Sequence, residues 1–269
     1  MTSPSPRCLF GTSTLLATGG MGLISVAKPM IQNVFADAMP LLVTTGFASA
    51  YLMGMAAGNL GGRIGWAAIS DKIGRRNTFH CYTLASIPIF GCLPFLIQEC
   101  VTNPSGPLAP FYLAAFCGST VAAITILGGT FAVLPAYEAD LYGPKYVDAI
   151  HGRFLLAATI STILGPGLLL NLKKMAETDA LRDLLSKVDP TAFMDKFGAE
   201  VGSAQGLIEA KTLTISKLMT IMPPGTVDPS PFLYNNTMYT MSALVGVAAC
   251  LHFLVKPVDQ KYFEKVEKK

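Results

Sequence analysis

Long runs of apolar residues alternate with short polar links along most of the chain. Crossing the ~30 Å hydrocarbon core of a bilayer takes about 20 helical residues, and six runs reach that length. These runs cover residues 8–30, 41–70, 78–98, 110–135, 150–172 and 232–255. All six contain Gly or Pro, which membrane helices tolerate because neighbouring helices satisfy the freed backbone groups. The pattern predicts an all-α integral membrane protein built as a bundle of six transmembrane helices.

The segment between the fifth and sixth runs, residues 172–231, has a different pattern. Asp189 and Pro190 are typical of a helix start, and Gly198 of a helix end. Residues 207–222 carry apolar side chains at helical spacing. We expect two or three short amphipathic helices on the membrane face or on a partner, with a solvated structural cap as the alternative. The sequence therefore predicts three parts of the chain: five membrane helices (1–171), the insertion (172–231), and a sixth helix with a basic tail (232–269).

Composition supports a membrane location. The chain is 51% hydrophobic and 14% charged, with a mean hydropathy of +0.48, whereas a soluble domain is roughly 25% charged. A protein with so few charged residues must cover most of its surface with lipid, so the bilayer is the first expected partner. A net charge of +3 without a basic stripe gives no indication of nucleic-acid binding.

Basic residues are distributed unevenly among the links. The link after the second run and the surroundings of the link after the fourth are basic, whereas residues 100–108 carry no charge. The basic positions are Lys72, Arg75, Arg76, Lys145 and Arg153, with further lysines in the tail. The positive-inside rule then places both termini and these two links on the cytoplasmic, matrix or stromal side. The plasma membrane and the mitochondrial inner membrane both fit, and a cleaved signal peptide is the alternative for the first run.

Residues with catalytic potential are scattered. The six cysteines stand singly, without a C-x-x-C pair. No phosphate loop, metal-ligand spacing or nucleophile with a paired base is present, so we expect no metal site, no cofactor and no enzymatic activity. His80, His151 and His252 lie near predicted helix ends, and we expect interfacial positions for them, with a proton relay as the alternative.

The most distinctive stretch covers residues 62–76, where the second run meets its basic link. Gly54, Gly58 and Gly62 recur every four residues, so they share one helix face on which another backbone can approach closely. Asp71 is placed to accept hydrogen bonds from a facing helix N-terminus. Its basic neighbours, Arg75 and Arg76, can pair with acids of the next link on that side, such as Glu138 or Asp140.

This stretch resembles the signature loop of the major facilitator superfamily, G-x-x-x-D-[RK]-x-G-[RK]-[RK]. Residues 71–76 match in full, and Gly65 is displaced towards the start of the pattern. The resemblance implies a conformational latch that opens as a transporter rocks; the alternative is that the loop only sets topology. The residues to which this role is carried over are Gly62, Gly65, Asp71, Lys72, Gly74, Arg75, Arg76, Glu138 and Asp140.

Three further stretches, 134–143, 149–153 and 164–167, resemble the oxalate/formate antiporter-like branch of this superfamily. In such proteins they belong to the last six of twelve helices, so the chain resembles the C-terminal half only. The resemblance implies pairing with a second six-helix half, supplied by another copy or by a separate chain. Oxalate itself is not implied, because residues 41–62 and 154–171 contain no Lys or Arg and an uncompensated dianion in the membrane is costly.

Hydroxyl and amide groups are the polar candidates left to line a pathway. They are Thr44, Thr45, Ser49, Tyr51, Asn59, Thr125, Ser161 and Thr162; the structural alternative is that such hydroxyls bond their own helix backbone. The resemblance then implies a half-size membrane transporter for a small solute of monocarboxylate type, acting by alternating access with a second six-helix unit. The alternative is a non-transporting accessory subunit of a large respiratory or photosynthetic membrane complex.

Overall fold

The computed structural model describes residues 5–143, 145, 147–210 and 212–256, and all regular structure in these residues is helical. Six helices are long: α1 (Ser5–Phe35), α2 (Thr45–Ile73), α3 (Arg75–Thr102), α4 (Ala109–Tyr142), α5 (Val147–Leu185) and α9 (Asn235–Phe253). Each corresponds to one of the six predicted runs. Four of them, α1, α3, α4 and α5, are long and apolar enough to cross a membrane, as expected of a multi-pass membrane protein. The predicted basic tail from residue 257 onwards lies outside the described residues.

The junction between α2 and α3 is shorter than predicted. Gly74 is the only residue between the two helices, and its φ of +86° is a conformation that glycine adopts without steric cost. The predicted link at residues 71–77 is therefore helical except for Gly74. At its other end α2 begins after Thr44, whose side chain accepts a hydrogen bond from the backbone N–H of Phe47.

Helix α5 continues far past the predicted boundary at residue 172. Its 39 residues correspond to about 58 Å of helix, nearly twice the hydrocarbon thickness. Residues 173–185 are polar but rich in good helix formers such as Lys, Ala, Glu and Leu. The change in polarity therefore does not end the helix, and the predicted boundary is wrong.

Beyond the end of α5, a small helical cap covers residues 186–234. Its α6 (Pro190–Phe197) begins at Asp189, whose side chain accepts from the Thr191 N–H at 3.0 Å, and ends at Gly198 in the left-handed conformation, as predicted. Residues 207–222 contribute to two further short helices, so the insertion holds the two or three short helices expected. Their helices, α7 (Ala204–Glu209) and α8 (Ile215–Met219), are short, and Thr214 caps the second one.

The cap has its own hydrophobic core, separate from that of the bundle. Its buried members are Leu181, Leu184, Val188, Phe193, Ala204, Leu213, Ile215, Leu218 and Leu233. The apolar faces of the short helices thus pack against one another and against the end of α5. This corrects the expectation that these faces lie on the membrane or on a partner.

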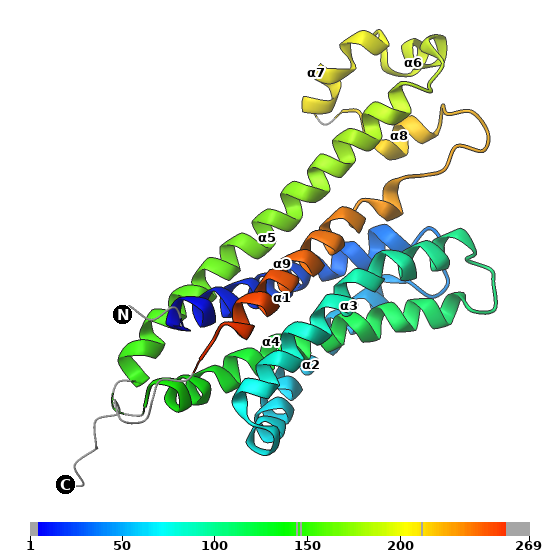
Figure 1. The fold of residues 1–269 in the computed structure, drawn as a ribbon. Helices are drawn as coiled ribbons and strands as arrows, with labels where there is room; N and C mark the ends of the chain where they lie inside the picture. Colours follow the sequence, from blue (N-terminus) through cyan, green and yellow to red (C-terminus); the bar gives the residue numbers. More distant parts are fainter. Residues whose placement is uncertain (1–4, 144, 146, 211, 257–269) are drawn as a thin grey trace.

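The long helices pack so that links alternate between two ends of the bundle (Figure 1). The start of α1, the junction between α2 and α3, the end of α4 and the start of α5 lie at one end, and the link at residues 103–108 and the cap lie towards the other. Helix α1 is the most buried of the four candidate spans and α5 the least. The basic positions that predict the inner side therefore gather at one end.

Helix contacts divide the bundle into two similar units. The most extensive contacts join α2 with α4, α1 with α5, α3 with α9, α3 with α4, and α1 with α9. Exchanging α1 with α4, α2 with α5, and α3 with α9 converts this set of contacts into itself. Because each unit has three helices and successive helices alternate in direction, the two units run in opposite directions through the bundle.

Candidate functional site

Close backbone contacts hold α2 against α4. A Cβ added to Gly62 would collide with the backbone of Thr125, and one added to Gly128 would collide with the carbonyl oxygen of Asn59. Gly58 faces the Val121 side chain. The two other predicted glycines on α2 are Gly54 and Gly65. A Cβ added to either of them would have no atom within 4 Å. The predicted glycine face therefore extends over Gly58 and Gly62.

A second seam of the same kind joins α1 with α5. Gly22 and Gly165 cross here, and a Cβ on Gly165 would lie 2.6 Å from the carbonyl oxygen of Thr18. Sequence analysis missed this contact, although glycines cluster at 19–22 and at 165–167. Since α1 corresponds to α4 and α5 to α2, the two seams are equivalent in the two halves of the bundle.

The predicted latch residues at the α2–α3 junction contact each other. Arg75 pairs with Asp71 at 2.5 Å and donates to the Ser70 hydroxyl at 2.7 Å. The Asp71 side chain is 66% exposed, and Lys72 and Arg76 are exposed as well. Asp71 is therefore at the surface of the bundle end, where a facing element could reach it.

Glu138 has a different partner from the one expected. Its side chain is fully buried, and its Oε2 lies 2.9 Å from Nδ1 of His151 on α5. The Arg75 guanidinium is engaged by Asp71 and Ser70 at the corner of α2 and α3. Because Glu138 faces into the bundle, the expected Arg75–Glu138 pair is not formed, whereas Asp140, two residues later, is exposed.

Two of the three histidines meet where α3 and α9 pack together. His252 is fully buried; one of its ring nitrogens lies 3.1 Å from the Tyr137 hydroxyl, and the other lies 3.0 Å from His80. Phe79 stacks on the His252 ring. His252 lies near the end of α9, as predicted, but it is buried among neighbouring helices. Because His80 and His252 are 172 residues apart, no local pattern indicates their contact.

Most of the predicted pathway hydroxyls bond within the bundle. Tyr51 donates to Thr120 at 2.8 Å across the α2–α4 seam, and Thr125 accepts from the Trp66 indole at 3.2 Å while donating to a carbonyl of its own helix. Ser161 and Thr162 both donate to the Ala158 carbonyl. These groups stabilise helices and seams, as the structural alternative expects.

The four remaining predicted pathway residues belong to the start and the middle of α2. They are Thr44, Thr45, Ser49 and Asn59. Thr44 caps the helix, and Ser49 donates to the Thr45 carbonyl at 3.0 Å. Lys28 of α1 donates to the Ser49 hydroxyl at 3.3 Å. Asn59 contributes its backbone to the seam. The predicted pathway residues are therefore spread over α2, α4 and α5 rather than gathered around one of the described cavities.

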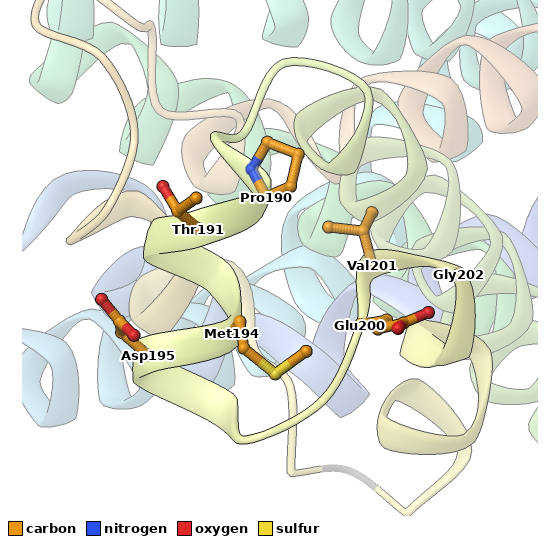
Figure 2. A pocket seen from close by; sticks show the side chains of 7 residues that line it. All are labelled: Pro190, Thr191, Met194, Asp195, Glu200, Val201 and Gly202. Atoms are coloured by element: carbon orange, nitrogen blue, oxygen red, sulfur yellow. The ribbon is translucent and has the colours of Figure 1, made fainter.

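The cap carries an open pocket of its own. Figure 2 shows it between α6 and the segment that follows, with Asp195 and Glu200 among its polar side chains. Its full lining is Pro190, Thr191, Met194, Asp195, Glu200, Val201 and Gly202. The cap lies at the opposite end of the bundle from the junction between α2 and α3 (Figure 1). Within the described part of the chain, no group of three His, Cys, Asp or Glu side chains is placed to hold a metal ion.

Comparison of the chain with known protein families, with curated proteins and with solved structures finds no match.

Proposed function

We propose that this chain is a half-size secondary transporter of the major facilitator type, which moves a small monocarboxylate-like solute by alternating access together with a second six-helix unit. The observation that carries the proposal is a pair of similar three-helix units that run in opposite directions. One unit consists of α1, α2 and α3, and the other of α4, α5 and α9. Each six-helix half of a major facilitator transporter is built from two such inverted repeats. The resemblance of the signature stretch at 62–76 supports the same family independently.

In this proposal all six long helices cross the membrane. Helix α2 packs extensively against α4 and is joined to α3 by Gly74 alone, so it shares the depth of two candidate spans. Helix α9 packs against α3 and α1 in the same way. Small residues and Asn59 lower the mean hydropathy of α2. They also allow α2 to pack closely against α4, because small side chains let helix backbones approach.

The second six-helix unit would cover α2 and α5. These two helices expose large apolar side chains along most of their length, namely Leu52, Met53, Leu60, Ile64 and Ile69 on α2 and Leu155, Leu156, Ile160, Ile163, Leu164 and Leu170 on α5. Alternating access rocks two units against each other around a central site. The exposed pair of Asp71 and Arg75 would then contact the partner unit at one end of the bundle and act as the latch.

Transport is tested with the tagged full chain, extracted in a mild detergent with its co-purifying chains and reconstituted into liposomes. We expect a small assembly, with saturable uptake of radiolabelled pyruvate or acetate. Asp71→Asn should lower the uptake rate several-fold, whereas the same substitution at Asp183, an exposed residue of α5 beside the cap, should not. Absence of uptake of any monocarboxylate by the intact assembly contradicts the proposal.

A second function, an accessory subunit of a large membrane complex, is favoured by one feature. The cap folds around its own core and projects beyond the bundle (Figure 1), so it offers a second surface, outside the membrane, to neighbouring subunits. Stoichiometric recovery of the chain in a megadalton-scale assembly without uptake activity would favour this alternative.

A further inference from the structure

A small cavity lies between α1, α2, α4 and α5, in the half of the bundle that contains the buried Glu138. Its volume is about 250 Å³, below the range of pockets that hold drug-sized ligands. Phe131, Leu134 and Phe154 form its apolar walls. Polar groups reach it from all four helices, namely Ser13 of α1, Arg63 of α2, Thr130 of α4 and His151 of α5. None of these four was predicted as a site residue from the sequence.

Three of the polar groups have bonding capacity that the protein leaves unused. Ser13 is 3% exposed, and its buried hydroxyl has no hydrogen-bond partner among the described residues. No described residue forms a hydrogen bond or ion pair with the Arg63 guanidinium. His151 binds Glu138 through Nδ1, which leaves its Nε2 for another partner. A buried hydroxyl without a partner is costly, so these groups indicate a missing ligand.

The position of Arg63 makes its charge informative. It precedes the end of α2 by ten residues, or about 15 Å along the helix axis, which places it well inside the proposed membrane span. Charged side chains at such depth are costly and are a functional indication by default. An anionic ligand offsets that cost, and the planar guanidinium can bind a carboxylate through two parallel hydrogen bonds.

The charges around the cavity favour a ligand with one negative charge. The described lining holds two side chains that can carry charge, Arg63 and His151, and His151 already contacts the Glu138 carboxyl group at 2.9 Å, so Arg63 is the lining charge that the described residues leave without a counterion. A monoanion neutralises it, whereas a dianion would leave a surplus negative charge in a medium of low dielectric constant. With its Nδ1 in contact with Glu138, the His151 ring can donate through Nε2–H to the ligand on the other side.

We propose that this cavity binds a small monocarboxylate. Arg63 and His151 meet the carboxylate, Ser13 donates a hydrogen bond to it, and the walls formed by Phe131, Leu134 and Phe154 contact its short aliphatic part. The inference deepens the proposed function and rests on it for the class of solute. Glu138 does not touch the ligand; it is a positioning residue for the His151 ring.

Binding is measured on the full chain with its co-purifying partners in lipid nanodiscs, with radiolabelled pyruvate in a scintillation-proximity assay. We expect saturable binding that unlabelled acetate and lactate compete for and that oxalate displaces less well. Arg63→Gln should weaken binding by about tenfold or more, because a charge-assisted hydrogen-bond partner is lost, and Arg63→Lys should restore part of it. Arg182→Gln, the same substitution at an arginine of α5 that is 62% exposed beside the cap, should leave binding unchanged.

The folded state of each variant is checked by its size-exclusion profile and thermal midpoint before binding is compared. Absence of saturable pyruvate binding by the wild type, or equal binding by the Arg63→Gln and Arg182→Gln variants, overturns the proposed site. Binding that depends on Arg63 without any uptake into liposomes keeps the site and rejects the transport function. Uptake that is unaffected by Arg63→Gln keeps the transport function and rejects the site.

Discussion

At the scale of single residues, the buried side chains of Glu138 and His252 each contact a polar side chain of another helix. Glu138 is paired with His151, and His252 with both Tyr137 and His80. Each contact joins different helices, so it fixes how those helices meet as well as satisfying the buried groups. Removal of one partner should therefore destabilise the bundle through the group that remains.

The Glu138–His151 contact can be measured by a double-mutant cycle. We expect Glu138→Ala to lower the free energy of unfolding by about 1–3 kcal/mol, because His151 loses its partner in the interior. His151→Ala should leave the Glu138 carboxylate buried alone, at a similar or larger cost. The double variant should be more stable than the sum of the two losses predicts, by about 0.5–3 kcal/mol. Thermal unfolding in detergent measures all three, and strictly additive losses would show that the pair does not interact.

The Tyr137–His252 hydrogen bond has a matched control on α9. Tyr137→Phe keeps the ring and removes the hydroxyl, so the buried His252 loses one partner, which should cost about 1–3 kcal/mol. Tyr239 is 55% exposed, and Tyr239→Phe should change stability by less than about 0.5 kcal/mol. Unfolding midpoints of the two variants, measured side by side, test this difference. Equal midpoints would mean that the hydrogen bond does not contribute to stability.

At the scale of helices, two seams of small residues define the architecture. The α2–α4 and α1–α5 contacts bring backbones together at Gly62, Gly128, Gly22 and Gly165. In lipid, where apolar burial between helices gives little driving force, such close packing is a main source of helix association. A methyl group placed in a seam should therefore act on the whole bundle.

Gly62→Ala and Gly54→Ala test this with the same chemical change on the same helix. The new methyl group at position 62 meets the Thr125 backbone, which cannot move aside, and we expect a loss of about 1–3 kcal/mol. At position 54 it meets nothing within 4 Å, and alanine is the better helix former, so stability should be unchanged or rise by up to about 1 kcal/mol. If both variants unfold at the same midpoint, the seam is not as tight as described.

Secondary structure was predictable wherever the deciding interactions are local. Apolar runs located the six long helices, and Asp189 with Gly198 located α6. The length of α5 was not predictable, because residues 173–185 are polar yet favour a helix. Hydropathy predicts where a helix leaves the hydrocarbon core, not where the helix itself ends. The pairing of His80 with His252 and of Glu138 with His151 was not predictable either. Both depend on which helices are neighbours, and that is a property of the tertiary fold.

At the scale of the whole molecule, the two opposed units give the bundle two distinct ends. One end holds the junction between α2 and α3, the end of α4 and the start of α5, and the cap lies towards the other (Figure 1). Four helices qualify as spans by length and apolarity alone, whereas the proposed transporter has six. The two arrangements differ in which links share a side of the membrane, so topology decides between them.

Single cysteines at Leu41, Lys72 and Thr226, each in a variant without the native cysteines, distinguish these arrangements. Leu41 is 94% exposed before α2, Lys72 is exposed at the end of α2, and Thr226 belongs to the cap. If α2 crosses the membrane, Leu41→Cys and Lys72→Cys react with a membrane-impermeant maleimide from opposite sides of sealed vesicles, and Thr226→Cys reacts from the side of Leu41→Cys. If only α1, α3, α4 and α5 cross, Leu41→Cys and Lys72→Cys react from the same side and Thr226→Cys from the other. We expect the first result, because Gly74 alone joins α2 to α3 and the α2–α4 seam holds α2 at the depth of its neighbours; the second result would remove the inverted repeat on which the proposed transport function rests.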